Sequence, residues 1–332
     1  MSPPHPWLSV LVPFYRVEPY LRECVESVLA QVDGGVEIVL LDDASPDDCG
    51  TIARELRKSH GEVIRLLGHD RNRGIAEARN TLLADARGDY VWFLDSDDLM
   101  LPGAIAGLKA AIERTGADLV LCDFRIVRER MALKHRLRGE YHRSTFSGRD
   151  NQLESDRGVL LRGLMAARQL HPWSKIARRS CWGTAPFPPR RVVMEDMAAI
   201  PTLVANVRTF VHVAEPWIGY RQRPGSALAT LDAGKFRDVL ASVRELHGAF
   251  ADDPGLDART RFAIDYFCIR ALSSVAHRIT GEQPALAREL RDTLQRLFPG
   301  GLRVILEECR RRGWWLRRRR ISKGIERLER LA

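Results

Sequence analysis

The stretch GDYVWFLDSDDLMLPGAI, residues 88–105, joins an apolar run to a cluster of acids. Residues 90–94 are apolar, which is typical of a strand inside a sheet. Asp95, Asp97 and Asp98 follow at once, and carboxylates this close together repel one another. Taking them out of water is costly unless a positive charge compensates them. The stretch therefore predicts a buried strand that carries acids to a cation.

Apolar runs and helical patterns alternate on the N-terminal side of this strand. We expect strands at residues 8–14, 36–45 and 62–69, and helices at residues 19–31, 45–60 and 74–86. The second of these helices is expected to begin with a Ser45 cap signal and with Pro46 at its first position. The alternation predicts an α/β fold with a doubly wound, mostly parallel sheet flanked by helices.

Two of the expected strands end in acids, at residues 42–43 and at residues 95–98. Ligands of such sheets bind beyond the carboxyl ends of the strands. Mg²⁺ and Mn²⁺ prefer oxygen ligands and are commonly held by one or two carboxylates together with substrate phosphates. The D-x-D-D turn thus points to a metal and nucleotide site. The alternatives are a solvated loop of acids, or a helix start that favours Asp98.

Five motifs, taken in order, resemble those of family-2 glycosyltransferases with the GT-A fold. They are SVLVPFYRVEPYLRECVESVLAQ (9–31), EIVLLDDASPDD (37–48), NRGIAEARN (72–80), YVWFLDSDDLMLPGAI (90–105) and MEDMAAIP (194–201). The resemblance covers roughly residues 7–230. It implies a GT-A domain over residues 1–230, with a nucleotide-binding half at 1–117 and an acceptor-side half at 118–230. Residues 231–332 read as a helical C-terminal extension.

The resemblance also assigns residues to the donor nucleotide. In that family the end of the first strand lies along the nucleotide, which implies Pro13 and Tyr15. The second acid of the D-D-x-S element contacts the donor base, which implies Asp43. Arg16 stands where the family usually has Asn, and a cation there would meet a donor phosphate or stay exposed.

The same resemblance assigns the metal and the catalytic base. The D-x-D element meets Mn²⁺ or Mg²⁺ and the diphosphate, which implies Asp97 and Asp98, with Asp95 nearby. The Asp of the late E-D pair is the family's general base, which implies Asp196. Glu195 is then its orienter or its substitute, and the alternative for the pair is ordinary acid at a helix start.

Basic residues near the acidic clusters are candidates for stabilising a departing diphosphate, because guanidinium groups pair well with phosphate oxygens. Arg73 and Arg79 precede the acidic strand, and Arg221 and Arg223 follow a later one. The alternative for each of them is that it is an ordinary surface arginine.

The segment HPWSKI resembles a family element near the acceptor side and supplies Trp173 and Lys175. Trp173 is expected either to stack on a sugar face or to be a core tryptophan. His171 beside it is read as a surface or core histidine rather than as a ligand.

The net charge of +9 is concentrated in residues 301–332, which hold eleven Lys/Arg and four Asp/Glu and so contribute +7. Trp314, Ile321, Ile325 and Leu328 form one helical stripe in this tail. Such a helix would lie on an anionic membrane surface or pack its stripe on the body. No recognised nucleic-acid module accompanies the tail, so no nucleic acid is expected.

These observations predict a metal-dependent, inverting enzyme of the hexosyltransferase type. Its donor is a nucleotide-diphosphate sugar, with a UDP-sugar first among the candidates, and its acceptor is a glycan or lipid-linked hydroxyl in cell-envelope or surface glycan synthesis. The six cysteines are scattered and no signal peptide or membrane span is visible, so we expect reduced thiols and a cytoplasmic protein, peripheral at the inner face of the plasma membrane if the tail binds lipid.

Two other classes remain open. One is a phosphatase of the haloacid-dehalogenase type, although its D-x-D usually lies on the first strand and is followed by Thr or Val where this chain has Leu99. The other is a membrane-associated scaffold that keeps a GT-A fold without catalysis.

Overall fold

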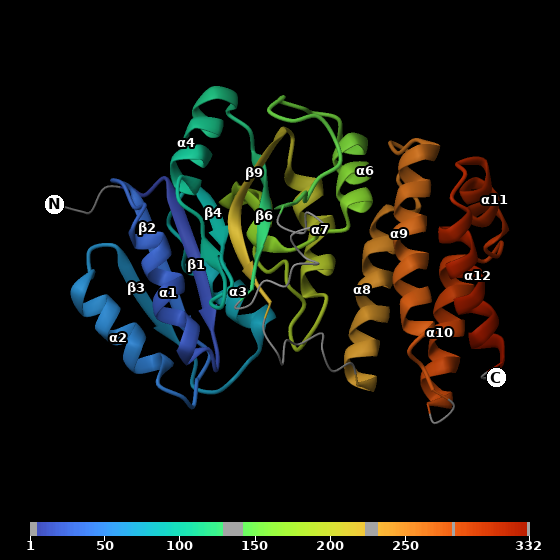
Figure 1. Ribbon diagram of the computed structural model, residues 1–332, viewed down its shortest axis with the longest axis horizontal. Coiled ribbons are helices and arrows are strands. Elements are labelled where there is room, and N and C mark those ends of the chain that lie inside the picture. The colour runs from blue at the N-terminus through green and yellow to red at the C-terminus, as the bar shows by residue number, and fades with distance from the viewer. Residues whose placement is uncertain (1–4, 129–141, 223–231, 281–282, 331–332) are drawn as a thin grey trace.

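The computed structural model describes residues 5–128, 142–222, 232–280 and 283–330 (Figure 1). Its strands are β1 (Leu8–Phe14), β2 (Val36–Asp42), β3 (Ile64–Gly68), β4 (Tyr90–Phe93), β5 (Leu99–Met100), β6 (Leu119–Val127), β7 (His142–Arg143), β8 (Lys175–Arg178) and β9 (Phe210–Arg221). Its α-helices are α1 (Glu18–Leu29), α2 (Cys49–Ser59), α3 (Ile75–Asp85), α4 (Ala104–Thr115), α6 (Arg157–Ala167), α7 (Glu195–Asn206), α8 (Ala233–Ala251), α9 (Ala258–Ala276), α10 (Pro284–Leu297), α11 (Arg303–Arg311) and α12 (Trp315–Arg330).

The N-terminal half of the sheet is parallel. Its order is β3-β2-β1-β4, and Leu11 of β1 pairs with Val39 of β2 on one side and with Phe93 of β4 on the other. Side chains alternate across β1: Val10 and Val12 join the core beneath α1, α2 and α4, while Leu11 joins the core beneath α3, α6 and α7. The expected doubly wound arrangement is confirmed.

The second half of the sheet is mixed. The order continues β8-β6-β9-β5, with β8 antiparallel to both β4 and β6, and with β6 parallel to β9. Helix α6 lies between β6 and β8 along the chain, and α7 lies between β8 and β9. All of these strands nevertheless form a single sheet flanked by helices (Figure 1).

The expected start of α2 was wrong. The helix begins at Cys49, and Asp48 occupies the cap position without a side-chain cap bond. Ser45 instead donates its backbone N–H to Oδ1 of Asp42 at 2.7 Å. Ala44 between them has a φ of 58°, so the chain turns sharply here before the helix can start. The Ser-Pro signal therefore belongs to the turn after β2.

The C-terminal helices extend the core on one face of the sheet. A single apolar cluster runs from Leu11 and Phe93 through α6 and α7 to α8, α9 and α12. Ile321 and Leu328 of α12 are buried, and Gly324 lies against Ser273 of α9. The tail stripe thus packs on the body, which was one of the two predicted outcomes. The predicted domain boundary at residue 230 and Arg223 lie outside the described residues.

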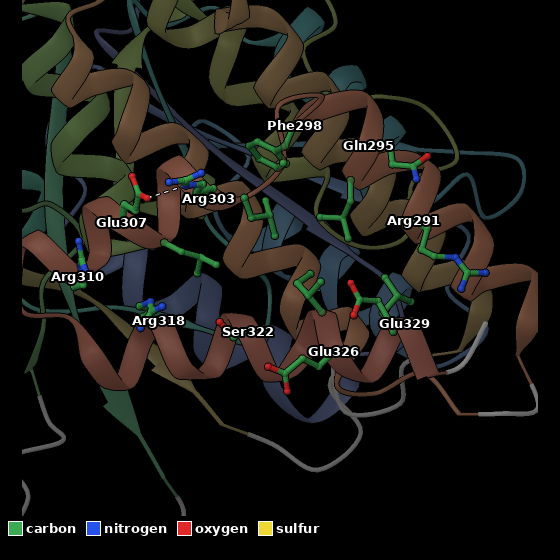
Figure 2. A pocket seen from close by; sticks show the side chains of 16 residues that line it. Arg291, Gln295, Phe298, Arg303, Glu307, Arg310, Arg318, Ser322, Glu326 and Glu329 are labelled. Carbon is green, nitrogen blue, oxygen red and sulfur yellow. Dashed lines mark hydrogen bonds and ion pairs between the residues drawn. The ribbon is translucent and has the colours of Figure 1, made fainter.

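A groove of about 760 Å³ opens between α10, α11 and α12 (Figure 2). Phe298, Leu306 and Ile325 contribute to its apolar lining, and both arginine and glutamate side chains surround it. None of the acids predicted to bind metal or nucleotide lines it. The groove therefore belongs to the helical region alone.

Among the described residues, no helix combines the length and the apolar character needed to cross a bilayer. The six cysteines are all buried and free.

The close contact between α6 and Phe146 gives a stability test. A Cβ at Gly163 would overlap the Phe146 ring, which is itself held against Phe210. Gly163→Ala is expected to lower the free energy of unfolding by about 1–3 kcal/mol, because a packed core resists added volume. Gly248→Ala in α8 is the control, since nothing lies within 4 Å of its Cβ; it should be neutral or stabilising by about 0.5 kcal/mol. Denaturant unfolding of both variants checks this, and equal effects would contradict it.

Candidate active site

Three parallel strands end at one edge of the sheet and bring their following residues together. β1 lies between β2 and β4, so Asp43 after β2 and Asp95 after β4 flank the end of β1. Met194 and α7 approach the same edge from the second half of the chain. The link between the two halves is Arg79 of α3.

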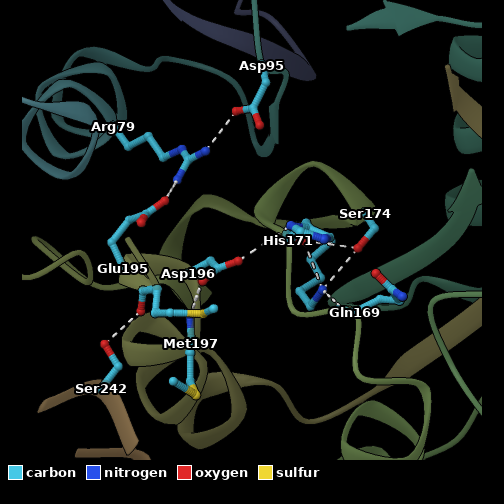
Figure 3. A network of polar contacts seen from close by, with 11 residues as sticks. Arg79, Asp95, Gln169, His171, Ser174, Glu195, Asp196, Met197 and Ser242 are labelled. Atoms are coloured by element: carbon cyan, nitrogen blue, oxygen red, sulfur yellow. Dashed lines mark hydrogen bonds and ion pairs between the residues drawn. The ribbon is translucent and has the colours of Figure 1, made fainter. Parts of the chain in front are cut away.

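Arg79 is a buried guanidinium shared by two carboxylates (Figure 3). Its Nη2 donates to Oδ1 of Asp95 at 2.7 Å, and its Nη1 donates to Oε1 of Glu195 at 2.5 Å. These acids stand at opposite ends of the network, one after β4 and the other at the start of α7. Because both Nη atoms are occupied, Arg79 connects the acidic strand to the catalytic candidate rather than standing free for a diphosphate as expected.

Glu195 does not contact Asp196 as an orienter. Its side chain turns toward Arg79, and it is almost fully buried. Burial raises the pKa of Glu195 to about 7, and the neighbouring Asp196 carboxylate adds to the rise, against the lowering effect of Arg79. The Glu195 carboxyl group is therefore poised to take a proton near neutrality.

Asp196 points the other way, toward His171 (Figure 3). Its Oδ2 lies 3.5 Å from Nδ1 of His171, and its Oδ1 accepts the backbone N–H of Met197 at 2.7 Å. Its side chain keeps 16% of its surface exposed. Burial lowers the pKa of His171, with Lys175 contributing, so the imidazole is neutral at pH 7. Asp196 is therefore a reachable carboxylate with a neutral neighbour.

Of the two outcomes expected for Trp173, the structure shows the core tryptophan, and Lys175 beside it is buried too. Trp173 is buried at 1% exposure and packs edge-on against Phe124, so it has no face for a sugar. His171 stacks on it at 4.9 Å between ring centroids. Lys175 is fully buried, and its Nζ donates to the backbone oxygen of His171 and to that of Gln169, both at 2.9 Å. Both residues therefore hold His171 in place instead of touching an acceptor.

Asp98 and Arg221 form the second part of the site. Oδ1 of Asp98 accepts the backbone N–H of Arg221 at 2.8 Å, and Nε of Arg221 donates to the backbone oxygen of Asp97 at 2.9 Å. The Arg221 guanidinium continues to Glu23 at 2.7 Å and lies over the ring of Tyr20. Arg221 therefore shapes the D-x-D-D turn, and its contact with a diphosphate stays a prediction.

Asp98 meets the conditions for a cation ligand. It is 1% exposed, and its Oδ2 has no hydrogen-bond partner. Burial raises the pKa of Asp98 well above its usual value, and the charges of Asp95 and Asp97 raise it further. Among the described residues no three His, Cys, Asp or Glu side chains form a closed metal cage. The donor set therefore fits a hard cation that takes one or two carboxylates and completes its coordination with phosphate oxygens.

Asp43 organises the loop after β3. Its Oδ1 accepts from the backbone N–H of Arg73 at 2.9 Å and lies 2.6 Å from Nδ1 of His69, while its Oδ2 accepts from Gly74 at 2.8 Å. The Arg73 side chain is exposed and pairs with Asp70. Contact of Asp43 with a donor base therefore stays a prediction, which would use the remaining acceptor capacity of Oδ2.

The end of β1 lies where the resemblance expects the nucleotide. Pro13 is buried and pairs with Leu41, whereas Tyr15 is 36% exposed beneath the Arg16 guanidinium. Arg16 has a φ of 53°, and Met194, directly before Glu195, has a φ of 61°. Non-glycine residues in this region store strain, which gathers at functional sites.

Sequence reasoning missed His171, which the structure places against the candidate base. The available signal was its position two residues before Trp173 in HPWSKI, since a histidine beside a buried tryptophan is fixed by stacking. Glu23 and Tyr20 were also missed. They lie one turn apart on α1, and only the packing of α1 beside the D-x-D-D turn reveals their contact with Arg221.

The comparisons with known proteins concern the sequence and the fold of the chain. Residues 9–169 match the family model described as Glycosyl transferase family 2. The uncharacterized glycosyltransferase EpsJ of Bacillus subtilis (strain 168) is 39% identical over 119 residues, which are 36% of this chain and 34% of EpsJ. The minor teichoic acid biosynthesis protein GgaB of the same bacterium is 38% identical over 97 residues, covering 29% of this chain and 11% of GgaB. The chain thus spans a third or less of these relatives.

A solved structure of S. aureus TarS, residues 1–349 in complex with UDP-GlcNAc, has the same overall fold. It superimposes with a TM-score of 0.72 over 98% of this chain and 90% of that one, at 19% identity. The likeness extends through the helical region and confirms the GT-A fold. Residues 9–169 thus resemble glycosyl transferase family 2.

Proposed function

We propose that this protein is an inverting glycosyltransferase that moves a hexose from a nucleotide-diphosphate sugar to an acceptor hydroxyl. UDP is the proposed nucleotide, supported by the UDP-GlcNAc held in the TarS structure. A glycan or lipid-linked acceptor of the cell envelope is proposed, supported by the role in teichoic acid biosynthesis that the name of GgaB states. The reaction would take place in the cytoplasm, at or near the inner face of the plasma membrane.

The observation that carries this proposal is that the side chains of Glu195 and Asp196 have different partners. The Glu195 carboxylate accepts a hydrogen bond from Arg79, whereas the Asp196 carboxylate is partly exposed beside a neutral His171. A carboxylate in that position accepts the proton of an incoming hydroxyl as the new bond forms at the anomeric carbon. Attack opposite the departing diphosphate inverts the anomeric centre, so an α-linked donor gives a β-glycoside.

The donor side of the proposal uses the first half of the chain. Residues 1–117 would bind the nucleotide along Tyr15 and Asp43, and residues 118–230 would supply the acceptor side. Asp97 and Asp98 would hold Mn²⁺ or Mg²⁺, and the unpartnered Oδ2 of Asp98 supports this. The chemistry that such an ion supplies when bound is neutralisation of charge on the leaving diphosphate. Arg221 would keep the turn in shape through its bonds to Asp97 and Asp98.

Asp196→Asn tests the base. Loss of the proton acceptor is expected to lower turnover by about 10²- to 10⁴-fold and to leave donor binding nearly unchanged, because Asp196 faces His171 rather than the D-x-D-D turn. Release of nucleoside diphosphate from a panel of nucleotide sugars measures turnover, and calorimetry measures binding.

The exposed Asp252→Asn is the matched control. Near-normal turnover of the Asp196 variant would remove this residue from the mechanism. No turnover of wild-type protein on any donor would favour the scaffold reading.

Asp98→Asn tests the metal site without relying on activity. Asn keeps an oxygen for the Arg221 N–H but removes a buried carboxyl group. The pKa of that group is raised by burial and by two neighbouring acids. The metal-free variant is therefore expected to melt at the same or a higher temperature than wild type. It should lose the rise in melting temperature that Mn²⁺ and a UDP-sugar together give the wild type. A metal response that survives the substitution would show that Asp98 is no ligand.

Glu195→Gln tests the Arg79 network by its pH dependence. Because the folded-state pKa of Glu195 is raised from 4.5 to about 7, folded protein binds more protons than unfolded protein between these values. The stability of wild type relative to Glu195→Gln should be greatest below about pH 4.5. It should fall, by an amount on the order of 3 kcal/mol, as the pH rises to about 7. Denaturant titrations across this range measure the difference. A flat difference would mean that Glu195 stays ionised throughout.

A further inference from the structure

The arginine-rich tail has a surface that the predicted active site does not use. Helix α12 presents three faces along its axis. Ile321, Gly324 and Leu328 face α9, and Arg318 and Glu326 face the groove shown in Figure 2. At 3.6 residues per turn a third face lies on the other side of the buried one, away from the groove. It is formed by Leu316, Arg319, Arg320, Lys323 and Arg327, which are exposed or nearly so.

Two large apolar side chains stand at the start of α12, beside this outward face. Trp315 is 59% exposed and Leu316 is 82% exposed. They are consecutive, and the stretch from Arg310 to Arg320 around them is exposed apart from the half-buried Trp314. Single exposed apolar residues are ordinary, but a tryptophan and a leucine side by side within a run of arginines are not explained by packing.

Of the cations on the outward face, Arg327 donates to the backbone oxygen of Ile279 at 3.2 Å, and the other three have no acid partner among the described residues. Among the described residues, no acid lies within ion-pair distance of Arg319, Arg320 or Lys323, and the acid of α12 nearest to them, Glu326, pairs weakly with Arg330 at 4.0 Å. Arg319 and Lys323 are four residues apart, as are Lys323 and Arg327, and like charges at this spacing destabilise a helix. This row of cations would be stabilised by an external anion.

We propose that this outward face of α12 docks the protein on an anionic lipid bilayer, with Trp315 and Leu316 entering the headgroup region. Tryptophan suits that depth because its ring is apolar and its N–H stays hydrated, and arginine suits the phosphate layer. The expected membrane contact thus uses a different face from the Ile321–Leu328 stripe.

The groove between α10 and α12 is a poorer candidate for an anionic surface. Its arginines, Arg303 and Arg310 among them, are accompanied by Glu307, Glu326 and Glu329, so its rim is mixed in charge (Figure 2). A flat sheet of negative charge is attracted to the uniformly basic face of α12 instead.

Sedimentation of the full chain with vesicles tests the docking face. The protein is expected to bind phosphatidylcholine vesicles that contain phosphatidylglycerol, to leave pure phosphatidylcholine vesicles unbound, and to be released at about 1 M salt, where charges are screened beyond about 3 Å. Arg319→Gln combined with Arg320→Gln should lower the partition coefficient by about tenfold or more. Trp315→Ser combined with Leu316→Ser should lower it on the order of tenfold.

Matched controls test whether vesicle binding depends on this face of α12 or on exposed arginine and apolar side chains in general. Arg259→Gln combined with Arg296→Gln removes two exposed arginines elsewhere in the helical region, and Leu153→Ser removes an apolar side chain that is 49% exposed. Both should leave vesicle binding within about twofold of wild type. All these side chains are exposed, so melting temperatures should stay unchanged and loss of binding would not reflect unfolding.

The proposal is overturned if wild type fails to bind anionic vesicles at low salt, or if the α12 variants bind as wild type does. It is also overturned if random-sequence duplex DNA is retained through Arg319 and Arg320 while vesicles are not, which would make nucleic acid the partner. Vesicle binding does not depend on turnover, so failure here leaves the proposed transferase activity untouched.

Discussion

The Arg79 guanidinium, shared between Asp95 and Glu195, is the interaction on which the arrangement of the site depends. Arg79 and Asp95 come from the parallel half of the sheet, and Glu195 arrives more than a hundred residues later. Loss of one partner in a buried ion pair costs about 3–5 kcal/mol, because the remaining charge stays out of water. The two halves of the chain are therefore fixed in one relative position by a contact with few alternatives, and Asp196 takes its place from that contact.

The C-terminal helices take part in the same positioning. Met194 holds its strained left-handed backbone directly before Glu195, and its backbone oxygen accepts from Oγ of Ser242 in α8 at 2.8 Å. Asp238 of the same helix accepts the backbone N–H of Val192 at 2.8 Å. The start of α7 is thus held by hydrogen bonds from α8 and from Arg79. The C-terminal helices are remote from the strand ends along the sequence. Through these bonds they nevertheless support the candidate base.

The sequence supported some parts of this picture better than others, for physical reasons. Continuous apolar runs such as residues 90–94 define buried strands, and acids directly after them must lie at the strand ends, so the sheet and the D-x-D-D turn were predictable. The partner of each polar side chain was not. Arg79 was expected beside a diphosphate, because no pattern within α3 reveals that Glu195 folds back onto it. His171 was dismissed for the same reason. The stripe on α12 was found correctly, but periodicity gives the direction of an apolar face and not the surface that covers it.

Asp98 shows a local cost in the fold that the proposed cation would relieve. Its Oδ2 is buried without a partner, although a one-residue change to a neutral side chain would remove that cost. Asp95 has Arg79 to balance it and Asp43 has three donors, so the neighbouring acids are satisfied within the protein. Arg221 approaches Asp98 with its backbone N–H, and its guanidinium goes to Glu23 instead. A buried carboxylate left with an open oxygen, at the edge where three parallel strands end, is better explained by an incoming cation than by the stability of the free chain.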